Sequence, residues 1–126
     1  MSDPDAMLRL EKNAYRPAES LVGAFQITGE PPERYTIELS VLWRTEGKGT
    51  EDIGVILFEE WEEDRRPFAF GAPQEFSVEL PRSPLSYDGV LVKIHWLARV
   101  RLRWPSGNEV LTEEAFRLGP LRAVAP

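Results

Sequence analysis

The sequence contains no cysteine, a single histidine and no long apolar run. Without cysteine, disulfide bonds and thiolate chemistry are excluded. One histidine without cysteine cannot build the His and Cys ligand sets of zinc sites. No stretch approaches the roughly 18 apolar residues that a membrane-spanning helix requires. These absences predict a protein without a metal site, a cofactor or an inserted membrane segment.

Positive charge is also scarce. Fifteen Lys and Arg oppose twenty-one Asp and Glu, which gives a net charge of −6. Nucleic-acid and anionic-membrane binders usually carry the opposite excess, so we expect neither as a main partner. Residues 1–5 are acidic and no apolar segment follows them, so we expect no secretory signal and a cytoplasmic location. The preference for Arg over Lys favours a bacterial source with GC-rich coding.

What the sequence does contain fits one ordinary globular domain. Its 126 residues are 42% hydrophobic, and this length can bury one hydrophobic core. We expect a single domain over residues 1–126, with loose termini at 1–6 and 120–126. Pro and Gly recur at intervals of about ten to fifteen residues, which is typical of short strands joined by turns.

Alternation of apolar and polar residues predicts seven strands. The clearest is the segment 35–44, in which alternate residues from Tyr35 to Trp43 are apolar. Residues 53–58 are apolar on both faces, so we expect this strand at the centre of a sheet. The expected strands cover residues 8–10, 21–27, 35–44, 53–58, 76–80, 92–103 and 110–118.

Seven short strands, each with an apolar face, need a second layer to cover them. We therefore predict an all-β fold, a two-sheet antiparallel immunoglobulin-like sandwich of about seven strands. A closed barrel is the alternative architecture, because the number of strands does not separate the two.

Three segments resemble the sequence pattern of one arrestin lobe. Residues 15–19 (Tyr-Arg-Pro-Ala-Glu), with Gly23 in the strand that follows, resemble the arrestin Tyr-x-Pro-Gly-Glu turn and its second strand. Residues 84–89 (Pro-Leu-Ser-Tyr-Asp-Gly) resemble the arrestin Pro-Ser-Tyr-x-Gly turn, which precedes a long strand. Residues 76–81 resemble the Phe-x-Leu-Pro run before that turn. The order and spacing of the three segments also match.

This resemblance implies a sandwich of the arrestin and sporulation-control (Spo0M-like) superfamily, whose members act mostly as adaptors and scaffolds. Ala18 stands where the family pattern has Gly. Arrestins carry two such lobes and this chain has the length of one, so the two-lobe mechanism does not carry over. The resemblance therefore implies a non-catalytic interaction module, arrestin-lobe-like in fold, with a protein or peptide as partner.

A basic stripe is the first candidate binding site. Arg forks match carboxylate and phosphate oxygens, so the stripe could bind an acidic or phosphorylated peptide. The alternative is cross-strand pairing with acids on neighbouring strands, such as Glu38, Glu109 or Glu113. The stripe lies on one face of the predicted strand 92–103 and comprises Lys93, Arg99, Arg101 and Arg103.

Aromatic residues supply the second candidate. Trp61 lies in the charged segment 59–67, where it is either an exposed interface anchor or tucked over the end of the sheet. Trp43, Trp96 and Trp104 are in phase with the core faces of their strands and are expected to be buried. His95, on a polar face, is expected to form a hydrogen bond on the sheet surface.

Three functions of other kinds remain as alternatives. A structural homodimer, or an accessory domain of a larger assembly, would cover an exposed edge strand. A small-ligand or carbohydrate-binding sandwich would need aromatic rings on a solvent face, against which the core-phased tryptophans argue. A hydrolase is the least favoured, because no Gly-x-Ser-x-Gly motif occurs and no carboxylate has a sequence context that indicates a raised pKa.

Overall fold

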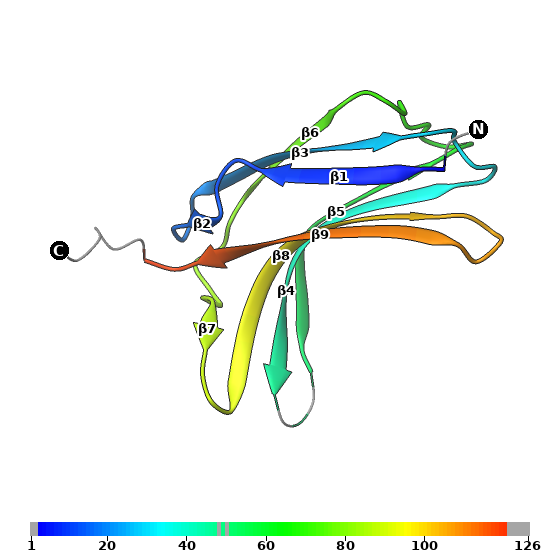
Figure 1. Ribbon diagram of the computed structural model, residues 1–126. Helices are drawn as coiled ribbons and strands as arrows, with labels where there is room; N and C mark the ends of the chain where they lie inside the picture. Colours follow the sequence, from blue (N-terminus) through cyan, green and yellow to red (C-terminus); the bar gives the residue numbers. More distant parts are fainter. Residues whose placement is uncertain (1–2, 48, 50, 121–126) are drawn as a thin grey trace.

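The chain folds into two β-sheets that face each other (Figure 1). The computed structural model describes residues 3–47, 49 and 51–120. The strands in chain order are β1 (Asp5–Leu10), β2 (Ala14–Tyr15), β3 (Ser20–Thr28), β4 (Thr36–Gly47), β5 (Ile53–Glu62), β6 (Gln74–Glu79), β7 (Tyr87–Asp88), β8 (Val92–Arg103) and β9 (Glu109–Leu118).

The smaller sheet has the strand order β1-β3-β6, and the larger has the order β2-β9-β8-β4-β5 with β7 beside β8. Every pairing is antiparallel except the short parallel contact between β2 and β9. The predicted two-sheet, all-β sandwich is therefore confirmed, and the barrel alternative does not hold. The two strands beyond the expected seven, β2 and β7, have two residues each and overlap the predicted turns at 15–19 and 84–89.

The core lies between the sheets and has the predicted phase. Trp96 is buried, whereas Trp43 and Trp104 are only half-buried against the core. The smaller sheet contributes Leu8, Leu21, Phe25, Ile27 and Phe76 to the core, and the larger sheet contributes Ile37, Leu39, Val41, Trp61, Trp96, Ala98, Val100, Leu102, Phe116 and Leu118.

The turn at residues 15–19 lies where the chain passes from β2 of the larger sheet to β3 of the smaller sheet. The Tyr15 ring is fully buried, and its hydroxyl accepts the Lys12 N–H at 2.9 Å. The Glu19 N–H donates to the Arg16 carbonyl at 3.1 Å, which closes a tight turn. The Glu19 carboxylate accepts the Arg16 N–H at 2.9 Å. Ala18 sits inside this turn with a φ of 67°, a backbone conformation that favours glycine.

Gly23 allows the three strands of the smaller sheet to pack closely. A Cβ at this position would stand 2.6 Å from Cζ of Phe76 and 2.8 Å from the carbonyl oxygen of Arg9. Both distances are too short for any side chain to fit, so Gly23, the glycine expected early in this strand (β3), is required for steric reasons.

The segment at residues 84–89 is tied to the larger sheet by hydrogen bonds. The Trp96 indole N–H donates to the Pro84 carbonyl at 2.8 Å. The Leu118 N–H donates to Ser86 Oγ, and the Ser86 N–H donates to the Leu118 carbonyl, both at 2.8 Å. These bonds hold the segment across the ends of β8 and β9.

Two expectations about the chain ends have different outcomes. The loose N-terminus expected at 1–6 is wrong for Asp5 and Ala6, because these residues pair with Thr28 and Ile27 of β3. The expectations for residues 1–2 and 121–126 concern positions outside the described residues. The described residues contain no helix of the length and apolarity needed to cross a membrane.

The expected central position of residues 53–58 is wrong, because β5 is the last strand of the larger sheet. Its outer face is uncovered, and the side chains of Ile53, Val55 and Phe58 are 64%, 54% and 54% exposed. A run that is apolar on both faces is typical of a central strand, but here one of those faces meets solvent.

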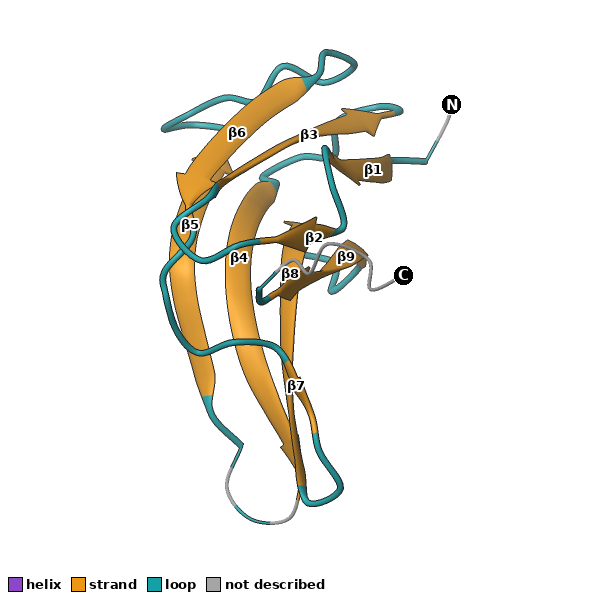
Figure 2. Ribbon diagram, turned by 90° about the vertical axis from the view of Figure 1, so that its left-hand side faces the viewer, coloured by secondary structure: helices purple, strands orange, loops and turns teal. Residues whose placement is uncertain are grey.

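The larger sheet also extends past the smaller one. Figures 1 and 2 show β4, β5 and β8 continuing below the level of β1, β3 and β6. Within the described residues, 44–47, 53–55 and 92–95 contribute no side chain to the core cluster. This half of the larger sheet therefore has no second layer over it.

Candidate interaction surface

Trp61 is not the exposed anchor that its charged surroundings suggested. Its side chain is 4% exposed. It pairs with Ile37 of β4 on the core face, and its ring packs edge-on against Phe25 and Phe68, each at 5.6 Å between centroids. The Arg66 guanidinium lies over it at 4.4 Å. Phe25 and Ile37 come from distant strands, so the local sequence could show only part of the surroundings that bury Trp61.

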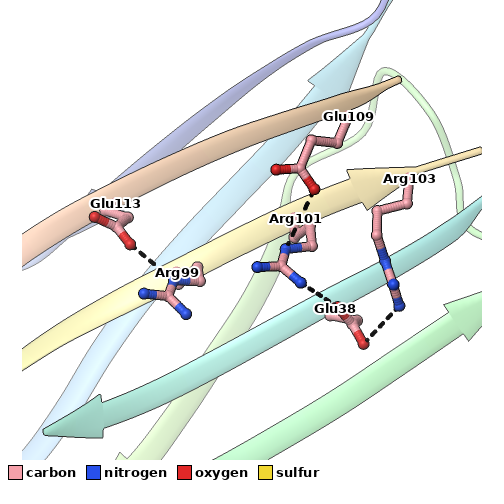
Figure 3. Close-up of polar contacts among 6 residues, drawn as sticks. All are labelled: Glu38, Arg99, Arg101, Arg103, Glu109 and Glu113. Carbon is pink, nitrogen blue, oxygen red and sulfur yellow. Dashed lines mark hydrogen bonds and ion pairs between the residues drawn. The ribbon is translucent and has the colours of Figure 1, made fainter. Parts of the chain in front are cut away.

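The arginines of the basic stripe form cross-strand ion pairs, as the second of the two interpretations expected (Figure 3). Three arginines meet three glutamates on the outer face of the larger sheet, so the row is electrically balanced. This geometry disfavours a free basic site for a phosphorylated peptide. The contacts are Arg99 to Glu113 at 2.8 Å, Arg101 to Glu109 at 3.6 Å and to Glu38 at 3.9 Å, and Arg103 to Glu38 at 3.1 Å.

Lys93 and His95 continue the same face toward the uncovered half of the sheet. Lys93 Nζ lies 3.6 Å from Asp88 of β7. His95 Nε2 lies 2.7 Å from Glu46 of β4, which confirms the expected surface hydrogen bond. Each of these polar side chains thus has a partner on a neighbouring strand.

Three groups have shifted pKa values with clear causes. The hydrogen bond from His95 lowers the pKa of Glu46. Burial raises the pKa of Glu60, and the neighbouring Glu62 raises it further by repulsion. Burial also raises the pKa of the Tyr15 hydroxyl. Within the described residues, no group of three or more His, Asp or Glu side chains could hold a metal ion.

An apolar row crosses the outer face of the larger sheet between the arginine row and the His95–Glu46 pair. The register places Leu97 of β8 beside Leu42 of β4, and Leu42 beside Val55 of β5. Leu97 and Leu42 are buried, but Val55 at the sheet edge is not. Phe58 lies on the same face, opposite Ser40. The row therefore opens to solvent along β5.

Sequence reasoning missed this exposed apolar surface. Eight of the eleven large apolar side chains that are exposed among the described residues fall in the segments 53–58 and 85–92. Val90 is fully exposed and Leu91 is 74% exposed, in the loop between β7 and β8. A signal was present, since apolar residues directly follow the Asp88-Gly89 turn. The exposed set in these segments is Ile53, Val55, Phe58, Leu85, Tyr87, Val90, Leu91 and Val92.

The chain resembles known proteins in its structure, not in its sequence. No protein-family model and no curated protein matches the chain. Among solved structures, Spo0M, a sporulation control protein from Bacillus subtilis, matches 96% of the chain with a TM-score of 0.66 and 17% sequence identity. The chain has a Spo0M-like fold. The match covers 51% of the Spo0M chain, so this chain spans about half the length of that protein.

A second solved protein matches less well. A β-glucosidase from Listeria innocua, solved with isofagomine and with gluconolactone, matches 93% of this chain and 16% of its own. The identities are 18% and 17%, and the TM-score is 0.41 in both cases. That score is too low to establish a shared fold. The Spo0M-like fold supports the expected arrestin-like architecture and says nothing about a binding partner.

Proposed function

We propose that the chain is a non-catalytic protein-interaction module of the adaptor or scaffold kind, acting in the cytoplasm. One observation carries the proposal: most of the exposed large apolar side chains of the described residues lie in two clusters, one along the free edge strand β5 and one around β7 and the start of β8. Single exposed apolar residues are ordinary, but clusters of exposed apolar side chains are typical of interaction sites.

The polar features of the same sheet support an interaction module less directly. Each arginine of the row already has a carboxylate partner, so the row stabilises the sheet and leaves the apolar surface as the free one. Two tryptophans, Trp61 and Trp96, are buried, which disfavours the alternative of a carbohydrate site built from exposed rings.

Affinity purification with mass spectrometry, using the 126-residue chain as bait in its native host, tests the proposal. A bait carrying Val55→Asp, Val90→Asp and Leu91→Asp places charges on exposed side chains of both β5 and the loop between β7 and β8, and should lose its partners. A Met7→Asp bait is the matched control, because Met7 is 56% exposed on the smaller sheet. The proposal fails if the wild-type bait captures nothing beyond the tag-only control, or if all three baits capture the same proteins.

A further inference from the structure

Strand addition needs outward-facing backbone N–H and C=O groups and exposed side chains beside them, and the free edge of β5 has both. Glu62 exchanges two hydrogen bonds with Arg66, at 3.1 and 3.0 Å, on the side away from β4. The N–H and C=O of one strand residue point to the same side of the strand, and that side alternates from residue to residue. The backbone N–H and C=O of Phe58, four residues before Glu62, therefore also point away from β4. At the other end, the Asp52 carbonyl accepts the Thr45 N–H at 2.9 Å, so the backbone groups of Asp52 point toward β4.

By the same alternation, the backbone N–H and C=O groups of Ile53 and Val55 point away from β4. The outward backbone groups of the edge thus belong to Ile53, Val55 and Phe58, whose side chains are more than half exposed. Among the described residues, the only pairing on this side of β5 is the bridge between Glu62 and Arg66. Proteins usually protect such an edge with charge or proline, and residues 53–58 contain neither.

Charge at the two ends of this segment indicates the occupant. Glu51 and Asp52 precede it, and Glu59 and Glu60 follow it. Glu60 belongs to none of the ion pairs of the described residues, and the raised pKa of its carboxyl reflects burial and acidic neighbours. Glu59 already pairs with Arg66 at 3.0 Å, so a cation brought to this end would relieve the repulsion at Glu60.

A second copy of this chain fits the edge poorly. Antiparallel self-pairing of residues 53–58 would set Asp52 against Glu59 and Glu51 against Glu60, and like charges placed opposite each other are destabilising. The edge also has a bulge, because Val41 pairs with Leu57 while Leu42 pairs with Val55. A bulge bends and twists its strand, and a flexible peptide follows that bend more easily than the edge of a folded sheet.

We propose that the edge of β5 at residues 53–58 binds an extended peptide of another protein by strand addition. The peptide would carry apolar or β-branched residues at alternate positions and Lys or Arg at both ends. Main-chain hydrogen bonds would supply much of the affinity, and Val55 and Phe58 would contact alternate side chains of the peptide. This inference rests on the proposed interaction function and assigns its surface and the chemistry of its partner.

The experiment selects short random peptides displayed on phage against the 126-residue chain. Selected sequences should combine basic ends with alternating β-branched or aromatic residues. The strongest peptide is then synthesised and its binding measured by fluorescence anisotropy. Val55→Lys should weaken binding by about tenfold or more, equivalent to about 1.4 kcal/mol. Met7→Lys, which adds the same charge to a side chain of similar exposure on the edge strand β1, should leave it unchanged.

Backbone pairing has its own readouts. Methylation of alternate peptide N–H groups should abolish binding when it falls on the set facing β5, and should be tolerated on the other set. Hydrogen exchange at the amides of Ile53, Val55 and Phe58 should slow in the complex. The proposal is overturned if no peptide is selected, if both methylated sets bind equally, or if the Val55 and Met7 variants behave alike.

Two outcomes separate this inference from the proposed function. If sedimentation shows that the chain dimerises and Val55→Lys abolishes the dimer, the occupant is a second copy and the peptide assignment is wrong. If a Val55→Lys bait still captures the same partners as the wild type, the edge assignment is wrong while the interaction function stands.

Discussion

Replacing Ala18 by glycine should stabilise the protein. The residue occupies the second central position of the turn closed by the Glu19 N–H and the Arg16 carbonyl, with Pro17 at the first. Proline at the first central position and a positive φ at the second are features of a type II turn, which normally has glycine at the second. The φ of 67° at Ala18 therefore places a Cβ where the backbone disfavours one.

The size of the effect follows from two opposing terms. Holding an L-residue in the left-handed region costs roughly 1–2 kcal/mol, and Ala18→Gly removes that cost. Glycine also gives the unfolded chain more freedom, which costs about 0.4–1 kcal/mol of stability. The net gain should be about 0.5–1 kcal/mol, which corresponds to a rise in Tm of roughly 2–4 °C for a domain of this size.

Urea denaturation followed by tryptophan fluorescence measures the change in the free energy of unfolding. Ala115→Gly is the matched control, since Ala115 is also exposed but lies within β9 with no positive φ. That substitution should destabilise the protein by about 0.5–1 kcal/mol. A neutral or destabilising Ala18→Gly would show that the turn does not hold the residue in the left-handed conformation, and would refute the reasoning.

Three further predictions concern side chains. Trp61→Ala should cost about 3–5 kcal/mol of stability in a urea titration, because it empties a large buried volume; a loss below about 1 kcal/mol would contradict its burial. Glu38→Gln should cost about 1 kcal/mol at low salt and less at high salt, since it removes a carboxylate shared by two arginines and partly screened by solvent; an unchanged free energy would contradict the network. His95→Ala should raise the pKa of Glu46 in an NMR titration. The lowered pKa of Glu46 contributes stability at neutral pH that is lost as the pH falls through its folded-state pKa, so this acid-side loss should shrink in the variant.

Much of the sandwich could be predicted from the sequence, because burial between two sheets imposes a period of two on each strand. The alternation that begins at Tyr35 placed Ile37, Leu39 and Val41 in the core, where they are fully buried. The same periodicity put the arginines of the long strand on the opposite face. Their acidic neighbours were foreseeable as well, since cross-strand pairing needs only the phase of each strand and a surplus of carboxylates.

The order of strands within a sheet could not be predicted in the same way. Periodicity records which face of a strand is apolar, but it does not record whether a further strand pairs along its edge. The residues 53–58 satisfy the pattern of a central strand, and only the long-range pairing with β4 on one side shows that β5 is an edge. The two-residue strands β2 and β7 are too short to produce any periodic signal.

The bulge in β5 explains why Val55 and Trp61 lie on opposite faces of the larger sheet. A regular strand would place Val55, Leu57 and Trp61 on the same face, since they differ by even numbers of residues. The pairing of Leu42 with Val55 and of Val41 with Leu57 leaves Ile56 as an extra residue, which reverses the phase between them. Trp61 is therefore buried against the core while Val55 faces solvent at the free edge. The extra residue turns Trp61 to the core at one end of β5 and Val55 to the outer face at the other, so the burial of Trp61 and the place of Val55 in the proposed peptide site are two consequences of one irregularity.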